Sequence, residues 1–382
     1  MAGKKIFISV GDPSGDMHGA NLMKEVFNRD PEVEFHGLGI QRMHDAGLHS
    51  LHAMDDHAIM WASTLVKIPT LWQIYNDCKR FFEEKKPDVV VLIDYAGFNM
   101  HLAHAAARRG VPVIYYVCPQ LWAHGSWRIK KFRKVVKKLL LVYPFEEEFY
   151  AGSGLNCKYV GHPLFDELEK REQDNDLVDR LRAEKGEYLV SILPGSREQE
   201  IYKLLPLFLR AAQDIHKRHP QASFAISCHH ARNMDLIEII ANRFKLPFEI
   251  VIGNLPEVIE ASSVCLTSSG TVTLEVAAHL TPMVVAYRIS PIAYFVAKPY
   301  IETPYLCLVN KAAGEHLVPE SLMCWDDHKW ITDHALELML DEEKRKHVKS
   351  GLARVKAVMG GSGASAAAAA EVLNMVNGAD QG

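Results

Sequence analysis

The fold of this chain is decided first by Lys4-Lys5-Ile6-Phe7-Ile8-Ser9-Val10, followed by Gly11-Asp12-Pro13-Ser14-Gly15-Asp16. The first seven residues are mostly apolar and favour a β-strand, and the next six are typical of a turn. Residues 19–27 then have a helical pattern. The same succession recurs at residues 89–93 with Asp94, and at residues 113–117 with Cys118-Pro119. Near-continuous apolar strands that alternate with helices predict a parallel sheet covered on both faces.

The alternation stops at a polar stretch, residues 167–179, and then starts again. This stretch is the best candidate for a linker. We therefore expect two Rossmann-like α/β domains, at residues 1–166 and 180–349. A C-terminal helix at about residues 350–380 is a candidate to pack back on the first. The two domains are either unrelated, or they face each other in a GT-B arrangement with a ligand in the cleft between them. We favour facing domains, because open α/β sheets bind ligands at the carboxyl ends of their strands.

Length, charge and cysteine content exclude several classes of protein. A chain of 382 residues predicts two domains. The net charge of −4 argues against a general nucleic-acid-binding protein. The seven cysteines are dispersed and form no CxxC pair, which indicates reduced thiols in a cytosolic protein. We see neither a signal peptide nor an apolar run near the roughly 20 residues that span a bilayer, so we expect a cytoplasmic or peripheral protein.

Two turns of the second half are suited to bind a diphosphate. Leu193-Pro194-Gly195-Ser196-Arg197 lies between a predicted strand and a helix, where backbone N–H groups and the Arg197 guanidinium suit a phosphate. Ser269-Gly270-Thr271 has the same placement, and Glu275 lies one turn further along the helix, where its carboxylate can accept the hydroxyls of a ribose. The alternatives are a structural turn with a surface arginine and a helix cap with an acidic first turn. Neither sequence is a P-loop or a GxGxxG motif.

Candidates for a general base lie in the first half. Asp16 and His18 belong to the first turn, and Asp94 follows the strand at residues 89–93. A carboxylate or an imidazole at the carboxyl edge of a sheet can remove a proton from a bound hydroxyl. Each of these residues can equally be a helix cap or a surface group.

The turns taken together resemble the lipid-A-disaccharide synthase family. The resemblance is carried, in the family's order, by residues 10–16, 93–99, 115–123, 143–146, 160–164, 193–197, 269–275, 304–310 and 314–320. It implies a GT-B glycosyltransferase that transfers a sugar from UDP-2,3-diacylglucosamine to the 6-hydroxyl of 2,3-diacylglucosamine 1-phosphate (lipid X). The products would be a β-1′,6-linked disaccharide and UDP, formed with inversion and without a metal or other cofactor.

The resemblance also implies roles for individual residues. Arg197 and the amides of Ser269, Gly270 and Thr271 would hold the diphosphate, Glu275 the ribose, and Asn310 would lie near the donor. Ser14, Gly15 and Asn99 would bind substrate in the acceptor domain. Many members carry a second Asp where this chain has Gly97. We therefore expect the base to be Asp94, with Asp16 and then His18 behind it. Asp12 replaces a Glu common in the family, which is a mild change.

Lipid substrates call for a surface that contacts the inner membrane. A basic amphipathic helix with aromatic flanks is predicted from Trp122, Trp127, Arg128, Lys130, Lys131 and Lys134, within a segment that continues to Lys138. Met60 and Trp61, where Met-Gly is usual, belong to an apolar segment, residues 59–72, that would lie beside it. The alternative is a solvated basic helix and a buried apolar one. A homodimer is also conceivable.

Two other functions compete with this prediction. One is a GT-B enzyme that uses a soluble UDP-sugar, such as a UDP-N-acetylglucosamine epimerase. The other is a nucleotide-binding or membrane-scaffold protein without catalytic activity. The polar turns at strand ends favour an enzyme, and the aromatic and basic segment favours a lipid substrate.

Overall fold

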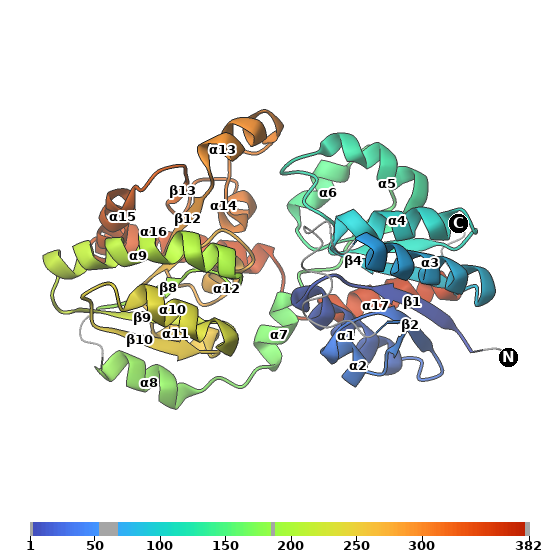
Figure 1. Cartoon of the computed structure of the whole chain (residues 1–382), viewed down its shortest axis with the longest axis horizontal. Coiled ribbons are helices and arrows are strands. Elements are labelled where there is room, and N and C mark those ends of the chain that lie inside the picture. The colour runs from blue at the N-terminus through green and yellow to red at the C-terminus, as the bar shows by residue number, and fades with distance from the viewer. Residues whose placement is uncertain (1–2, 53–67, 185–187, 379–382) are drawn as a thin grey trace. The chain divides into compact units, whose positions relative to one another are not determined.

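The computed structural model describes residues 3–52, 68–184 and 188–378. The chain divides into two compact units (Figure 1). Unit 1 comprises residues 1–168 and 360–382, and unit 2 comprises residues 169–359. Each unit contains one parallel sheet with helices on both faces, which confirms the predicted α/β class.

Unit 1 has a seven-stranded sheet in the order β3-β2-β1-β4-β5-β6-β7. Its strands are β1 (Lys5–Ser9), β2 (Glu34–Leu38), β3 (His49–Ser50), β4 (Val89–Ile93), β5 (Val113–Tyr116), β6 (Lys138–Leu141) and β7 (Cys157–Tyr159). Its helices are α1 (Pro13–Phe27), α2 (Gln41–Asp45), α3 (Ile68–Glu84), α4 (Ala96–Ala107), α5 (Ile129–Val135), α6 (Phe145–Tyr150), α7 (Leu164–Lys170, which ends in unit 2) and α17 (Ala364–Val376).

The core of unit 1 explains why its central strands are apolar throughout. All five residues of β4 are buried, because α3 and α4 cover one face of the sheet while α1 and α17 contact the strand from the other. On the first face, Phe7 of β1 packs edge-on against Phe82 of α3, with ring centroids 4.8 Å apart. The one charged residue buried in a central strand, Lys138 of β6, forms an ion pair with Glu371 of α17 at 2.5 Å.

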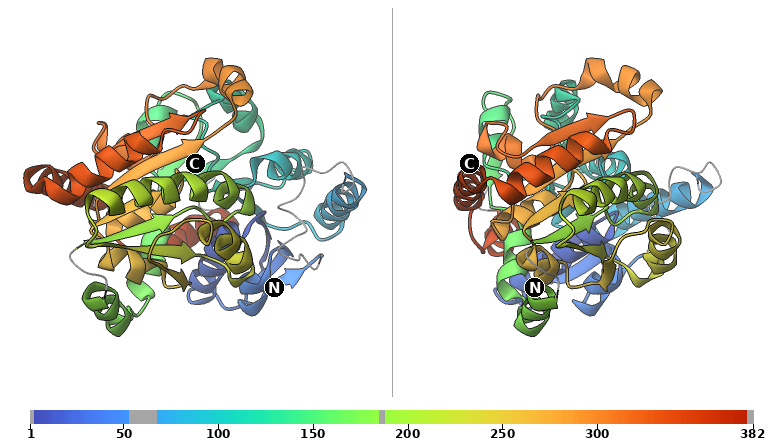
Figure 2. Two further views of the ribbon diagram at one scale, coloured as in Figure 1. Left: turned by 60° about the vertical axis from the view of Figure 1, so that its left-hand side comes forward. Right: turned by 90° about the vertical axis from the view of Figure 1, so that its left-hand side faces the viewer.

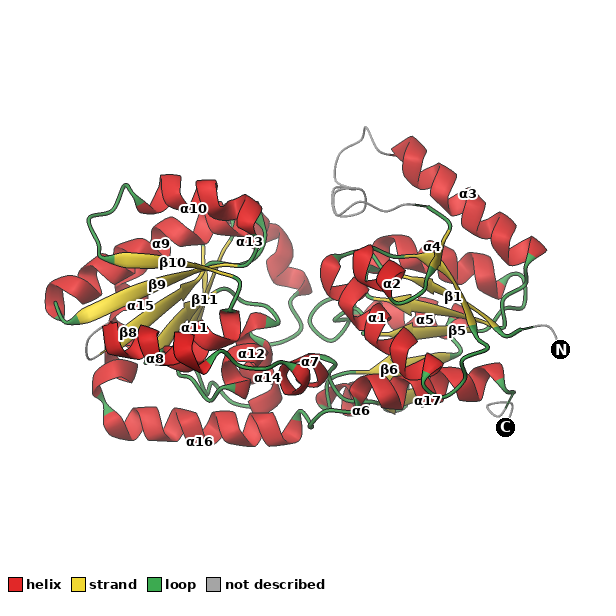
Figure 3. Ribbon diagram, turned by 90° about the horizontal axis from the view of Figure 1, so that it is seen from below, coloured by secondary structure: helices red, strands yellow, loops and turns green. Residues whose placement is uncertain are grey.

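Unit 2 has a six-stranded sheet in the order β10-β9-β8-β11-β12-β13, whose strands lie between two layers of helices (Figure 3). Its strands are β8 (Tyr188–Leu193), β9 (Ala222–Cys228), β10 (Phe248–Ile252), β11 (Val264–Thr267), β12 (Met283–Arg288) and β13 (Glu320–Met323). Its helices are α8 (Asn175–Glu184), α9 (Glu198–Arg218), α10 (Met234–Ala241), α11 (Leu255–Ala261), α12 (Val272–Ala278), α13 (Pro291–Ala297), α14 (Leu308–Ala313), α15 (His328–Leu340) and α16 (Glu342–Val358).

The expected linker at residues 167–179 contains the boundary between the two units, which falls after Leu168, but most of it is helical. The end of α7 and the start of α8 occupy it, and only residues 171–174 lie between them. These four residues are held within unit 2 by the buried carboxylate of Glu257. It forms an ion pair with Arg171 at 2.9 Å and accepts the backbone N–H of Asp174 at 3.2 Å. Within this polar stretch, Arg171 and the backbone of Asp174 thus satisfy a buried charge.

The single C-terminal helix expected at residues 350–380 is two helices. Helix α16 belongs to unit 2 and α17 to unit 1, and the break contains Gly360 and Gly363 in left-handed conformations (φ +84° and +109°). Helix α17 packs along α1. Its first turn is capped by Asp166, whose carboxylate accepts the N–H groups of Gly363, Ala364 and Ser365 at 2.5 to 3.1 Å.

Candidate active site

Each sheet has a point where the direction of strand succession reverses. In unit 1 this point lies between β1 and β4, and in unit 2 between β8 and β11. Open α/β sheets bind ligands in the crevice that forms there, at the carboxyl ends of the strands. In unit 2 the turns that follow β8 and β11 are the two that the sequence singles out for a diphosphate. They are neighbours, because the backbone N–H of Ser268 donates to the carbonyl of Leu193 at 3.1 Å.

The turn after β8 requires a glycine and presents an arginine. Gly195 has φ +110°, and a Cβ atom there would lie 2.4 Å from the carboxylate of Glu200. Arg197 immediately precedes α9, and its side chain is 62% exposed. The guanidinium forms an ion pair with Glu200 at 3.2 Å, which is an exposed contact of low expected strength. Arg197 is therefore accessible to a phosphate from solution.

The turn after β11 combines an anchored residue with open ones. Ser269 Oγ donates to the carbonyl of Leu306 at 2.7 Å, so this hydroxyl is already used. A Cβ atom on Gly270 would meet nothing within 4 Å, and Thr271 is exposed. A ligand can therefore approach the backbone of this turn at Gly270 and Thr271.

Glu275 has the electrostatic environment of a ligand-binding carboxylate. It is half-buried on α12, and among the described residues its carboxyl group has no hydrogen-bond partner. Burial raises its pKa to about 7, and the charge of Glu257 adds to this effect while that of Arg171 opposes it. A partly buried carboxyl group without a partner is a candidate for a functional site.

Asn310, which was expected near the donor, is a buried residue of α14, a helix that contacts α12. Its side chain is wholly buried, with Oδ1 accepting the N–H of Val318 and Nδ2 donating to the carbonyl of the same residue, both at 2.9 Å. The amide therefore fixes α14 to the loop before β13. A side chain engaged in this way supports the shape of the site without reaching a ligand.

The reversal point of unit 1 is tightly packed. The ring of Tyr95, which follows β4, lies so close to Gly11, which follows β1, that a Cβ atom on the glycine would be 2.1 Å from Tyr95 Cγ. Asp94 and Tyr95 both have left-handed backbones (φ +46° and +45°), and so does the β-branched Val117 after β5 (φ +53°). Such strained residues gather at functional sites, where the surrounding structure holds them in place.

Asn99 holds the strained turn together and is corrected from a substrate-binding role to a structural one. It is fully buried, accepts the hydroxyl of Ser9 at 2.8 Å, and donates to the carbonyls of Ile93 and Asp94 at 3.1 and 3.0 Å. The hydroxyl of Tyr115 donates to the same Asp94 carbonyl at 2.5 Å. The backbone of Asp94 is thereby fixed while its side chain remains exposed.

Asp16, a candidate base from the sequence, is a helix cap in this structure. Its buried carboxylate accepts the N–H groups of Ile40, Arg42 and Met43 at 2.6, 2.9 and 3.4 Å, at the start of α2. Burial raises its pKa, against the lowering effect of these three hydrogen bonds. Its oxygens are therefore occupied by the backbone.

His18 and its neighbours in the first turn are partly unavailable as well. Burial lowers the pKa of His18 to about 4, so its imidazole is neutral at pH 7. Ser14 is exposed, with its Oγ 3.3 Å from His18 Nε2. The backbone N–H of Gly15 donates to Asp12 Oδ1 at 2.7 Å, which caps α1. Only Ser14 of this group presents a polar side chain to solvent.

Two further residues at the same edge of unit 1 had been given no role. His162, after β7, has its ring centroid 6.3 Å from that of His18, and burial lowers its pKa to about 3. Glu146, after β6, accepts the N–H groups of Val142 and Tyr143 at 3.2 and 3.1 Å, and burial raises its pKa to about 7. Both lie in stretches that carry the family resemblance, and their position after β6 and β7, the strands that follow β5 in the sheet, was the available signal.

The basic helix is shorter than expected, and the apolar residue Phe132 packs into unit 1. Helix α5 covers only residues 129–135, its Phe132 is buried in unit 1, and Lys138 belongs to β6. Trp127 is 60% exposed with Lys131 Nζ 5.0 Å from its ring centroid, and Lys130, Lys131 and Lys134 are all exposed. Arg128 is half-buried and donates to the carbonyl of His124 at 3.3 Å.

The structure corrects one residue of the expected membrane contact, and two others lie outside the described residues. Trp122 is only 6% exposed and packs edge-on against Phe145, with ring centroids 5.0 Å apart, so it cannot contact a membrane. Met60 and Trp61 lie outside the described residues. Within the described ranges, no helix combines the length and the apolar composition that crossing a membrane requires.

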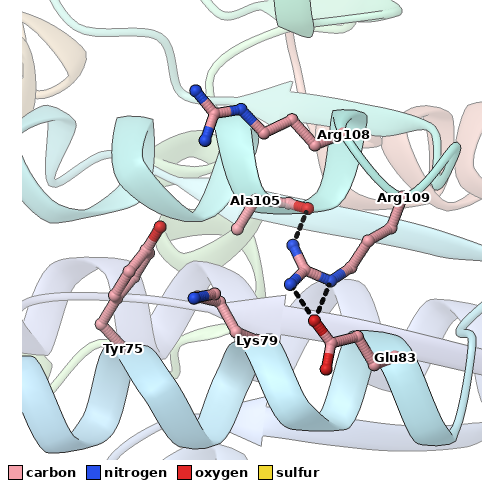
Figure 4. A pocket seen from close by; sticks show the side chains of 6 residues that line it. All are labelled: Tyr75, Lys79, Glu83, Ala105, Arg108 and Arg109. Atoms are coloured by element: carbon pink, nitrogen blue, oxygen red, sulfur yellow. Dashed lines mark hydrogen bonds and ion pairs between the residues drawn. The ribbon is translucent and has the colours of Figure 1, made fainter.

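A separate hollow of about 400 Å³ lies between α3 and α4 (Figure 4). Arg109 bridges it, with hydrogen bonds to Glu83 and to the carbonyl of Ala105, while Lys79 and Arg108 line it. It adjoins the C-terminal end of α4, whereas Asp94 precedes the N-terminal end of that helix. The hollow is therefore not part of the site at the strand ends.

Solved structures share the fold of this chain. The chain superposes on a Staphylococcus aureus protein described as an MnaA–UDP co-structure, with a TM-score of 0.65, 14% identity, and coverage of 98% of this chain and 96% of the other. Acinetobacter baumannii MurG gives a TM-score of 0.55 at 12% identity, with 98% and 99% coverage. At this level of identity the likeness establishes the fold alone. It confirms the GT-B class.

Sequence relatives identify the family. Lipid-A-disaccharide synthase of Syntrophotalea carbinolica is 33% identical over 376 residues, covering 98% of this chain and 95% of that protein. The enzyme of Geobacter metallireducens is 32% identical over 376 residues, with 98% and 97% coverage. The model of the lipid-A-disaccharide synthetase family matches residues 6–372. With two parallel α/β units and this match along its length, the chain belongs to the lipid-A-disaccharide synthetase family of glycosyltransferases, which condense UDP-diacylglucosamine with lipid X.

Proposed function

We propose that this chain transfers the diacylglucosamine unit of UDP-2,3-diacylglucosamine to the 6-hydroxyl of 2,3-diacylglucosamine 1-phosphate. The hydroxyl oxygen attacks the anomeric carbon in line with the departing diphosphate. The bond to the phosphate oxygen breaks, its electron pair leaves with UDP, and the hydroxyl proton passes to a base. The observation that carries this proposal is the match to one enzyme family over residues 6–372 of a chain with two reversal points.

The donor site that we propose lies at the reversal point of unit 2. Arg197 and the backbone of Ser269, Gly270 and Thr271 would bind the diphosphate, and Glu275 would accept ribose hydroxyls. Three observations support this assignment: the two turns are neighbours, Gly270 is open, and Glu275 has no partner among the described residues. Arg197 would also balance the charge that develops on the departing UDP.

Asp94 is the base that we propose. It is exposed at the carboxyl end of β4, and Asn99 and Tyr115 fix its backbone carbonyl. Asp16 is occupied by three backbone donors and His18 is buried, so both are less suitable. A fixed backbone limits the positions that the carboxylate can take, which favours proton transfer to one bound hydroxyl.

Membrane association is also a proposal. The lysines at 130, 131 and 134, together with Trp127, form an exposed basic surface suited to the anionic headgroups of the inner membrane. The protein would then be cytoplasmic and peripheral. Vesicle flotation at low and high salt tests this, because recovery that does not depend on salt contradicts an electrostatic contact. A homodimer stays a prediction.

The decisive experiment is incubation with UDP-diacylglucosamine and lipid X, followed by mass analysis. We expect a disaccharide 1-phosphate with four acyl chains and one equivalent of UDP. An epimerase would instead convert a soluble UDP-sugar without any lipid acceptor. UDP release that is independent of the acceptor would therefore contradict the proposed reaction, and failure to bind UDP at all would favour a scaffold protein.

A further inference from the structure

Unit 2 carries a group of exposed apolar side chains that the proposed diphosphate site does not use. It consists of Ile292, Phe295 and Val296 of α13, followed by Tyr300 and Ile301, and these side chains are between 45% and 79% exposed. We call these five residues the α13 surface. Ile292, Phe295 and Val296 are spaced i, i+3 and i+4, so they lie on one face of the helix. Figures 1 and 2 show α13 standing out from the helices that cover the sheet of unit 2.

An apolar helix face normally packs against a core, so its exposure needs an explanation. Elsewhere in the described part of unit 2, large exposed apolar residues occur apart from one another, such as Ile239 on α10 and Trp325 after β13. Such single residues are ordinary on protein surfaces. The α13 surface differs because five of them fall within ten residues.

The position of the α13 surface connects it to the donor site. Helix α13 begins three residues after β12. Strand β12 is the parallel neighbour of β11, so both strands end at the same edge of the sheet. Further along the chain, after the α13 surface, Leu306 contacts the proposed diphosphate turn. Ser269 Oγ donates to its carbonyl at 2.7 Å. The turn that would hold the diphosphate is thus hydrogen-bonded to the chain that follows the α13 surface.

We infer that the α13 surface binds the acyl chains of the donor lipid. This inference rests on the proposed function, which gives the donor two acyl chains next to the sugar on the diphosphate. With the diphosphate at residues 269–271, a nearby surface must take up hydrocarbon, and transfer of hydrocarbon from water to apolar side chains is favourable in proportion to its area. Lys298, whose Nζ lies 5.8 Å from the ring centroid of Tyr294, keeps its charge at the margin of this apolar surface.

The test compares long-chain and short-chain donors. We would replace Phe295 and Val296 by Gln, which keeps helix propensity, and use Ile239→Gln with Trp325→Gln as the matched control. Donor KM is measured in mixed micelles with UDP-diacylglucosamine of both chain lengths, and UDP affinity by calorimetry. We expect KM for the long-chain donor to rise about tenfold or more in Phe295→Gln/Val296→Gln, with UDP affinity and the control pair unchanged.

Several results would overturn the inference. An unchanged KM for the long-chain donor would do so, as would an equal loss for the short-chain donor and for UDP itself. A KM effect that appears only with donor in vesicles would assign the surface to the bilayer, and one that follows a change in sedimentation would assign it to a second copy of the chain. A lack of disaccharide from the unaltered protein would reject the proposed function instead, and this inference with it.

Discussion

The two sheets reverse their strand order at corresponding places, yet the two reversal points are built differently. In unit 1, Tyr95 fills the space above Gly11, and buried side chains such as Asn99 bind the backbone. In unit 2, a Cβ atom on Gly195 would meet Glu200, but nothing lies within 4 Å of one placed on Gly270, and Arg197 is exposed. A diphosphate needs several accessible donors, whereas a single hydroxyl needs one acid in a fixed position. The same strand order thus holds a fixed turn in unit 1 and leaves backbone groups accessible to a ligand in unit 2.

The largest effect should come from the fixed acid of unit 1. Asp94→Asn removes the proposed base but keeps the size of the side chain, so we expect turnover to fall by roughly two to four decades. UDP affinity should not change, because the proposed nucleotide site belongs to unit 2. Single-turnover kinetics and calorimetry with UDP measure the two quantities. Near-normal turnover would remove Asp94 from this role.

Gly97 provides the matched control for that experiment. A Cβ atom there meets nothing within 4 Å, so Gly97→Asp should fold normally and place a second carboxyl near the same turn. If the double variant Asp94→Asn/Gly97→Asp regains turnover, an acid in this turn is sufficient for proton transfer. Loss of activity in Asp94→Asn that Gly97→Asp cannot restore would mean that the fixed backbone of Asp94 matters as well.

Substitutions in the proposed diphosphate and ribose site of unit 2 should lower the affinity for UDP. Arg197→Ala and Glu275→Ala each remove a proposed charged partner of UDP, and we expect each to cost about 1.5–3 kcal/mol, or roughly one to two decades in affinity. Calorimetric titration with UDP checks this, with thermal unfolding as the control for folding. Unchanged affinity in both variants would place the donor elsewhere.

Gly11 and Gly270 form a pair that tests the comparison directly. Gly11→Ala forces a methyl group against the ring of Tyr95, and overpacking of this kind typically costs about 1–3 kcal/mol of stability. Gly270→Ala meets no neighbour and should unfold like the unaltered protein. Denaturant unfolding of both variants measures the difference. Equal stabilities would show that Gly11 tolerates a methyl group as well as Gly270 does.

The smallest effect is a pH dependence of UDP binding. The pKa of Glu275 is raised to about 7 by burial, so the ionised form that accepts ribose hydroxyls is lost as the pH falls through 7. The apparent Kd should rise about fivefold between pH 7 and pH 6 through this residue. Glu275→Gln should remove that component and leave only the titration of UDP itself. A pH profile shared by both proteins would mean that Glu275 does not contact the nucleotide.

Much of the fold follows from local sequence, because buried parallel strands such as residues 89–93 must be apolar on both faces. The turns at residues 193–197 and 268–271 could be predicted for the same reason, since each follows such a strand. The roles of Asp16 and Asn99 could not. Their partners, Ile40 and Ser9, are 24 and 90 residues away, and sequence alone does not show that a polar group is already satisfied.

The cap on α17 has a consequence for how the protein is made. Asp166 and Ser365, which it joins, are 199 residues apart, and all of unit 2 is synthesised between them. At about 5–20 residues per second, a ribosome needs roughly 10–40 s to bridge that interval. During this time the nascent first unit has α1 uncovered and Lys138 without its ion-pair partner Glu371. The second unit is one continuous segment and can fold first. The first unit therefore begins to be translated before the second but completes its fold after it.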